Sequence, residues 1–191
     1  LLRVMAQPAD IDAALLYDFS AATAVAIYLQ TEDKGAVQYF CGPDVALVSK
    51  NSAANAVMAC LPGDFLQGNA GVNALLVDAV LTALQPVASD NILEAFCGLG
   101  NFTLPLSQQV NRITAIELSG NMLARAATQA AVLDLKNIDW VSGNLDQLNA
   151  QKLKLPAYNK ILLDPPRDGA QDFCKTIILK GVERIVYVSC N

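Results

Sequence analysis

Asn91–Asn101, with the sequence NILEAFCGLGN, is the stretch that decides the fold. Its first part, Ile92–Ala95, is an apolar run that predicts a short buried strand, and the glycine-rich turn Phe96–Gly100 follows directly. A helix is expected to begin at Asn101 or just after it. A strand, a tight glycine turn and a helix start together favour a site for a nucleotide-like ligand, because the backbone can approach the ligand closely there.

The following strand indicates which part of a nucleotide is bound. Glu117 ends the predicted strand Arg112–Glu117, and a carboxylate at that point can bind ribose hydroxyls. The G-x-G spacing of Gly98 and Gly100 lacks the third glycine of the usual dinucleotide fingerprint. The pattern therefore favours an adenosine-containing cofactor over the alternative enzyme class, a nicotinamide-dependent oxidoreductase.

Beyond a linker at residues 85–90, predicted strands and helices alternate, which indicates an α/β fold with a parallel sheet and helices on both faces. The strands are expected at Ile92–Ala95, Arg112–Glu117, Ile138–Ser142, Lys160–Asp164 and Arg184–Val188. The helices are expected from Asn69 or Ala70 to about Leu84, at Phe102–Val110, at Ser119–Leu135 with Ser119 as N-cap, near Leu145–Gln151, and at Gln171–Lys180.

Residues 1–69 are interpreted as a small mixed α+β domain. A weak helix is expected at Asp10–Tyr17, and strands at Thr23–Gln30, Val37–Phe40 and Asp44–Ser49. Cys41 and Cys60 are interpreted as small buried hydrophobic residues. No chemistry is assigned to residues 1–60.

Composition excludes several function classes. No apolar window is long enough for a membrane helix and the N-terminus lacks the shape of a signal peptide, so we expect a soluble cytoplasmic protein. The absence of histidine excludes triads with a histidine base. Five cysteines without C-x-x-C spacing argue against a four-cysteine metal site.

The net charge of −5 is unlike that of most nucleic-acid-binding proteins. Because the chain starts without Met, we expect an excerpt of a longer protein whose other parts supply basic charge.

The notable polar residues all follow predicted strands, so they are expected at one rim of the sheet. Asn144 offers an amide to the edge of adenine, although an ordinary turn residue is an equally good interpretation. Pro165 and Pro166 fix the Asp164 carboxylate at the end of its strand. Arg167 can meet a phosphate or a base edge, with a surface arginine as the alternative.

Cys190 is the residue that distinguishes between reaction types. The alternative interpretation of Cys190 is a buried thiol without a catalytic role at the end of an apolar strand. Thiolate attack on carbon 6 of a pyrimidine makes carbon 5 nucleophilic enough to accept a methyl group, and a base then removes the carbon-5 proton. The target base must leave its stack, and Phe65 and Gln67 could meet it there. The simpler interpretation of Leu61–Asn73 is a crossover between domains in which Phe65 is packed and Gln67 is solvated.

Six motifs, taken in order, resemble the bacterial RNA uracil-5-methyltransferases, and most closely the 23S ribosomal RNA (uracil-5-)-methyltransferases with an N-terminal TRAM domain. The motifs are PGDFLQGNAGVN (62–73), FCGLGNFTLPL (96–106), AIEL (115–118), GNL (143–145), LLDPPRDG (162–169) and YVSCN (187–191). The resemblance implies a Rossmann-like S-adenosylmethionine-dependent methyltransferase core at 70–191, truncated at its C-terminal end, after a small central domain at 1–69.

The resemblance also implies roles for individual residues. Cys190 would be the nucleophile, and Asp164 would lie close to the target uracil. Contacts to S-adenosylmethionine would come from Gln67, Phe96, Gly98, Asn101, Glu117, Asn144 and Asp164. The RNA substrate would meet Phe65, Gln67 and Arg167.

The substrate implied is a uridine in 23S ribosomal RNA, methylated by a monomer that does not bind membranes. The alternatives are a transfer-RNA uracil-5-methyltransferase, an enzyme for another ribosomal RNA site, and a non-catalytic RNA- or nucleotide-binding fragment. The general base of the family is a Glu in a C-terminal H-x-E stretch, and its iron–sulfur cysteines have C-x5-C-x2-C spacing. Neither pattern occurs in these 191 residues, so we expect a fragment without the general base and without the cluster ligands.

Overall fold

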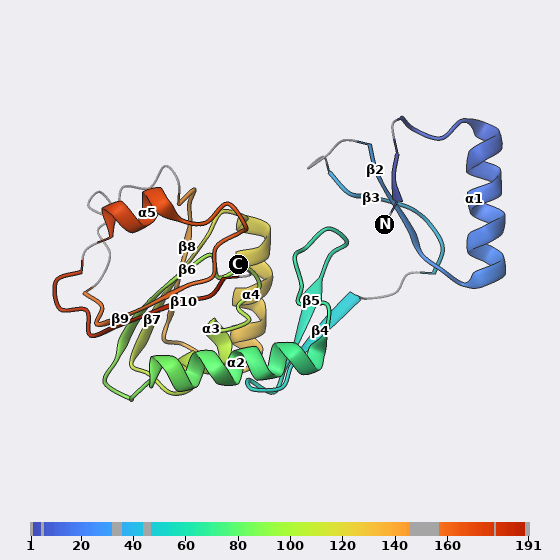
Figure 1. Cartoon of the computed structure of the whole chain (residues 1–191). Helices are drawn as coiled ribbons and strands as arrows, with labels where there is room; N and C mark the ends of the chain where they lie inside the picture. The colour runs from blue at the N-terminus through green and yellow to red at the C-terminus, as the bar shows by residue number, and fades with distance from the viewer. Residues whose placement is uncertain are drawn as a thin grey trace. The chain divides into compact units, whose positions relative to one another are not determined.

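A computed structural model describes residues 2–4, 6–31, 36–43, 47–145, 157–177 and 179–189 (Figure 1). The chain forms two compact units. The first comprises Leu1–Val48 and Ala59–Phe65, and the second comprises Ser49–Met58 and Leu66–Asn191. The predicted domain boundary between residues 69 and 70 stays a prediction.

The second unit contains one sheet of five parallel strands in the order β10-β9-β6-β7-β8. The strands are β6 (Asn91–Ala95), β7 (Arg112–Glu117), β8 (Ile138–Ser142), β9 (Lys160–Leu163) and β10 (Arg184–Tyr187). They confirm the strands predicted for this unit, with ends shifted by about one residue. The last four residues of β6 are buried, as expected for a parallel strand covered on both faces. This topology, with the strand order reversing at β6, agrees with the Rossmann-like fold expected from the sequence.

Helices cover both faces of this sheet (Figure 1). They are α2 (Ala70–Leu84), α3 (Thr103–Ser107), α4 (Gly120–Val132) and α5 (Gln171–Thr176). One apolar cluster joins side chains of α2, α3 and α4 to Ile92 and Ile113 of the sheet. A second cluster, on the other face, joins Phe173 of α5 to Leu93 and Ile161. The alternating direction of side chains along each strand produces these two clusters.

The helix ends show where local sequence signals were sufficient. Ser119 is the predicted N-cap of α4, and its Oγ accepts a hydrogen bond from Met122 N at 3.3 Å. Helix α4 ends at Val132, before the predicted Leu135, because Asp134 has a left-handed backbone with φ of 56°. Helix α3 is shorter than the predicted Phe102–Val110.

Asn137, which lies outside α3, satisfies the carbonyl groups at its end. Its Nδ2 donates to Ser107 O at 2.8 Å and to Val110 O at 2.9 Å. Helix α5 ends at Thr176 rather than Lys180, because Ile177 is extended. The helix predicted near Leu145–Gln151 falls, apart from Leu145, outside the described residues.

The first unit contains helix α1 (Asp10–Thr23) and a sheet in the order β1-β2-β3. The strands are β1 (Leu2–Arg3), β2 (Ile27–Gln30) and β3 (Gln38–Cys41). The predicted strand Thr23–Gln30 is wrong in its first half, because α1 continues to Thr23 and ends in a left-handed Ala24 with φ of 53°. Cys41 and Cys60 are both buried, as expected.

A two-stranded sheet pairs β4 (Leu47–Asn51) with β5 (Ala56–Cys60). Strand β5 was not predicted, although its residues alternate between buried and exposed. Its buried side chains include alanine, which gives a weak apolar signal. Within the described part of the chain, no helix combines the length and apolar character needed to cross a bilayer.

Candidate functional site

The candidate site lies where the order of the strands reverses. Strand β6 has β7 on one side and β9 on the other, and ligands of such sheets bind outside the carboxyl ends of the strands at this point. The glycine turn follows β6, and Asp164 follows β9. The two segments are adjacent, because Asp164 N donates a hydrogen bond to Ala95 O at 3.3 Å.

The glycine turn has an unusual backbone. Gly98 and Gly100 have φ of 55° and 84°, and Phe96, which is not glycine, has φ of 65°. A left-handed L-residue is disfavoured by about 1–2 kcal/mol. The Phe96 ring packs edge-on against Phe173 with 6.4 Å between ring centroids, which helps to fix this conformation. Strained residues of this kind are concentrated at functional sites.

Glu117 fixes the turn to the end of β7. Gly98 N donates to Glu117 Oε2 at 3.1 Å, and Ser119 N donates to Glu117 Oε1 at 3.0 Å. Each carboxylate oxygen has more than one acceptor position, so both can still accept hydrogen bonds from ribose hydroxyls. The carboxylate is thus oriented before any ligand binds.

Asn101 is held by two residues that the sequence did not single out. Its side-chain amide exchanges two hydrogen bonds with that of Asn73 in α2, each of 2.9 Å. Asn51 Nδ2 donates to Asn101 O at 2.6 Å. Asn73 ends the motif at 62–73 and could have been found there, whereas Asn51 carries no local signal. We name Asn51, Asn73 and Asn101 the asparagine triad.

Carboxyl groups near the turn have raised pKa values. Burial raises the pKa of Asp164 to about 6. Burial, together with the nearby Asp164 charge, raises the pKa of Glu94 to about 8, although Thr103 opposes the shift. Burial and the charges of Glu94 and Glu117 raise the pKa of the Cys97 thiol well above its usual value. Cys97 is therefore not an activated thiol.

The remaining predicted site residues differ in their surroundings. Asn144 is half-buried, and the hydrogen bond from Gly143 N to Glu117 O, 3.0 Å long, places its loop at the end of β7. Arg167 is exposed. Gln67 is half-buried, and Phe65 is 74% exposed, so the interpretation of Phe65 as packed is wrong.

Cys190 and Asn191 lie outside the described residues. The chain can be followed to Ser189, and Val188 N donates to Leu163 O at 2.8 Å. The residue after Leu163 is Asp164. The strand pairing of β10 with β9 therefore continues to the point at which the Asp164 loop begins.

These groups fit a cofactor with ribose hydroxyls and cationic centres. Glu117 is oriented for the hydroxyls, and Glu94 and Asp164 supply acidic groups beside the turn. No group of three or more His, Cys, Asp or Glu residues in the described part of the chain is placed to bind a metal ion.

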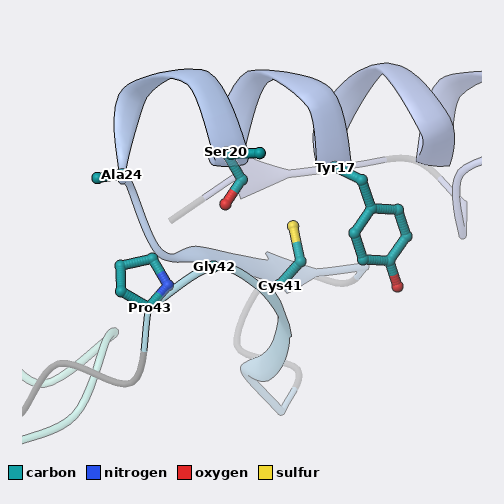
Figure 2. Close-up of a pocket in the computed structure, with 7 residues that line it drawn as sticks. Tyr17, Ser20, Ala24, Cys41, Gly42 and Pro43 are labelled. Carbon is teal, nitrogen blue, oxygen red and sulfur yellow. The ribbon is translucent and has the colours of Figure 1, made fainter.

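A shallow cavity of about 300 Å³ lies in the first unit, between α1 and the end of β3 (Figure 2). Its lining includes Ser20, Cys41 and Gly42. Ser20 Oγ donates to Val25 O at 2.8 Å, and the Cys41 thiol donates to Leu16 O at 3.9 Å. A side chain at Gly42 would lie 2.5 Å from Val25 O, so glycine is required there by close packing. Because its polar groups bond to the local backbone, we assign this cavity no ligand.

The sequence and the fold are similar to those of known proteins. A family profile described as tRNA (Uracil-5-)-methyltransferase matches residues 52–191. The 23S rRNA (uracil(1939)-C(5))-methyltransferase RlmD of Pseudomonas fluorescens is 41% identical over all of this chain and 42% of its own length. The protein of that name from Pasteurella multocida is 44% identical over 67% of this chain and 30% of its own length.

Among solved structures, the Pyrococcus abyssi tRNA (uracil-54, C5)-methyltransferase in complex with S-adenosyl-L-homocysteine has a TM-score of 0.66. It is 19% identical and matches 87% of this chain and 41% of its own. This likeness concerns the fold. The chain thus spans less than half the length of these relatives.

Proposed function

This chain belongs to the tRNA (uracil-5-)-methyltransferase family, and we propose that it supplies the cofactor site and the nucleophile of an enzyme that methylates carbon 5 of a uridine in 23S ribosomal RNA. The methyl donor would be S-adenosylmethionine. Ribosomal RNA is favoured over transfer RNA because relatives that match the whole chain at 35–41% identity are named as 23S rRNA methyltransferases.

One observation carries this proposal. The Asp164 loop lies beside the glycine turn through its hydrogen bond to Ala95 O, and β10 pairs with β9 as far as Val188 and Leu163. Val188 therefore leaves the sheet next to the Asp164 loop, at the switch point where a nucleotide ligand is expected, and we propose that the thiol of Cys190, two residues later, acts there. A methyl donor and a nucleophilic thiol can then act on the same base.

In the proposed mechanism, S-adenosylmethionine supplies an electrophilic methyl group. Glu117 would bind the ribose hydroxyls and Asn144 the edge of the adenine. Phe96 and Asn101, the latter held by Asn51 and Asn73, would make further contacts to the cofactor. Gln67 completes the cofactor contacts, and Phe65 and Arg167 contact the RNA.

Cys190 attacks carbon 6 of the uracil as a thiolate, which makes carbon 5 nucleophilic, and Asp164 lies close to the base. After methyl transfer, a general base removes the carbon-5 proton and the thiolate is eliminated. The 191 residues contain no H-x-E stretch to supply this base.

The substrate is tested by mass spectrometry of RNA from a strain that lacks the gene. We expect one 23S uridine, the one numbered 1939 in the names of the relatives, to lose its carbon-5 methyl group, and a plasmid copy of the gene to restore it. Transfer RNA should be unchanged. Loss of 5-methyluridine from transfer RNA instead would assign the enzyme to transfer RNA, and no change in either RNA would reject the proposal.

The role of Glu117 is tested by replacing it with glutamine. We expect affinity for S-adenosylhomocysteine to fall about 10- to 100-fold, because hydrogen bonds to a charged group contribute about 1.5–3 kcal/mol and tenfold corresponds to about 1.4 kcal/mol. Calorimetry measures the change. Glu183→Gln is the matched control, since Glu183 is exposed and precedes β10 at the opposite edge of the sheet. Equal affinity of both variants would remove Glu117 from the cofactor site.

A further inference from the structure

The hydrogen bonds of the asparagine triad show which group of Asn101 is left for a ligand. All three residues belong to the second unit. Asn51 and Asn73 are 2% and 7% exposed, so their amide groups depend on partners within the protein. An asparagine side chain has two N–H donors on Nδ2 and a carbonyl oxygen, Oδ1, that accepts up to two hydrogen bonds.

Asn73 and Asn101 form a reciprocal pair that does not by itself fix the orientation of either amide. Each Nδ2 donates to Oδ1 of the other residue at 2.9 Å. Turning both amides by half a rotation would exchange donor and acceptor in each, and the same two hydrogen bonds would form again. A contact with a third residue is needed to distinguish the two orientations.

Asn51 supplies this contact. Its Oδ1 accepts a hydrogen bond from Ala54 N at 3.1 Å, in the turn between β4 and β5. Because a backbone N–H group can only donate, Oδ1 of Asn51 must face Ala54 and its Nδ2 must face Asn101. Asn51 Nδ2 donates to Asn101 O at 2.6 Å and to Asn101 Oδ1 at 3.4 Å. If the paired amides were turned, two Nδ2 donors would face each other.

This orientation leaves one hydrogen-bonding group of the Asn101 side chain unused. Its Oδ1 accepts from both Asn73 and Asn51, and its Nδ2 uses one N–H on Asn73. The second N–H of Nδ2 has no partner among the described residues. A ligand that meets the Asn101 side chain therefore meets a donor.

We propose that Asn51 is a positioning residue of the cofactor site, which holds the Asn101 amide in the orientation that offers an N–H to a hydrogen-bond acceptor of the cofactor. Asn51 acts through Asn101 and lies outside the glycine turn. The orientation is set by a backbone N–H group of the β4–β5 turn, that of Ala54. The inference rests on the proposed function, in which Asn101 contacts S-adenosylmethionine.

Replacement of Asn51 by aspartate tests this role by calorimetry of S-adenosylhomocysteine binding to the whole protein. Aspartate has the same shape and still accepts from Ala54 N, but it has an oxygen in place of Nδ2. The Asn101 amide should then turn its N–H groups towards residue 51 and present Oδ1 to the cofactor. We expect affinity to fall about five- to tenfold, the value of one hydrogen bond.

Asn55→Asp is the matched control. It makes the same chemical change in the same turn, at an exposed residue whose left-handed backbone, with φ of 51°, aspartate also adopts. Asn55 N donates to Ser52 O at 3.2 Å, a bond that the substitution keeps. We expect its affinity for S-adenosylhomocysteine to equal that of the wild type. Equal affinities of Asn51→Asp and Asn55→Asp would overturn the inference.

A double-mutant cycle with Asn101→Ala separates positioning from a general effect on the fold. Asn101→Ala alone should lower affinity about five- to tenfold. Adding Asn51→Asp should then change affinity by less than about twofold, because no amide remains to be oriented. If the two losses multiply instead, Asn51 does not act through Asn101.

Nuclear magnetic resonance of the wild type gives a readout that needs no folded Asn51 variant. With asparagine labelled by ¹⁵N, the two Nδ2 proton signals of Asn101 are identified by their absence in Asn101→Ala. On binding of S-adenosylhomocysteine, the proton that is not bonded to Asn73 should shift more than the other. Equal shifts, or no shift, would overturn the inference and leave the proposed function intact. If the wild type does not bind S-adenosylhomocysteine, the proposed function falls, and this inference falls with it.

Discussion

Replacement of Cys190 by alanine is expected to abolish formation of 5-methyluridine and to leave affinity for S-adenosylhomocysteine unchanged. Without the thiolate, carbon 5 of uracil is not nucleophilic, so the rate should fall by at least about 10⁴-fold, as it does when a covalent nucleophile is removed. The measurement is transfer of labelled methyl groups to a 23S ribosomal RNA fragment by the whole protein, with calorimetry in parallel.

Cys174→Ala is the matched control for this prediction. Cys174 is a free cysteine that is exposed in α5, and we expect its removal to leave the rate unchanged. RNA containing 5-fluorouracil adds a positive readout, because fluorine at carbon 5 cannot be removed as a proton. A stable covalent adduct should form with the wild type and with Cys174→Ala, but not with Cys190→Ala. Continued methylation by Cys190→Ala would rule out the proposed chemistry.

The sheet was predictable from sequence because its signals are local. Buried parallel strands are short apolar runs, and the run Ile92–Ala95 followed by Gly98 and Gly100 marks the central strand and its turn. Ser119 marks the start of α4 in the same way. Features fixed by distant residues were missed. The end of α3 depends on Asn137, which is 30 residues from Ser107, and no pattern within the helix indicates it.

The candidate site shows the same division. Glu117 could be placed from its position at the end of a strand. Its partner Ser119 is close in sequence, and its other partner, Gly98, follows the neighbouring strand β6. The asparagine triad joins Asn51 to Asn101 across 50 residues, so no periodic pattern in the sequence indicates it. Glu94 lies within a run that predicts an apolar strand, and only its burial and its raised pKa distinguish it.

Replacement of Asp90 by alanine is expected to destabilise the second unit by about 3–5 kcal/mol, the loss found when one partner of a buried ion pair is removed. Asp90 Oδ2 lies 2.6 Å from Lys160 Nζ, and their side chains are 2% and 7% exposed. Asn159 Nδ2 donates to Asp90 Oδ1 at 2.7 Å, and Val87 N donates to Oδ2 at 2.7 Å. Without the carboxylate, the Lys160 charge would be buried with only the Gln85 carbonyl as partner.

Denaturant unfolding measures this change in the free energy of unfolding. The fluorescence of Trp140, the single tryptophan, monitors it, because Trp140 lies in the same sheet. Asp172→Ala is the matched control, because Asp172 pairs with Lys175 at 2.9 Å on the surface, with side chains 70% and 62% exposed. Asp172→Ala should lower the free energy of unfolding by less than about 1 kcal/mol. Adding Lys160→Met to Asp90→Ala should recover much of the stability, because the unpaired charge is then gone.

Lowering the pH should reduce the stability of the wild-type protein by part of the amount that Asp90→Ala does. Burial alone would raise the pKa of Asp90, but hydrogen bonds from Lys160, Asn159 and Val87 N, together with the Lys160 charge, outweigh it and leave the pKa below the usual 3.8. The unfolded state therefore binds this proton more readily, so the stabilisation is complete above pH 3.8 and is lost as the pH falls through the lower folded-state value. Asp90→Ala should lack this component of the acid dependence. An equal loss of stability with acid in the variant and the wild type would show that the pair does not stabilise the sheet.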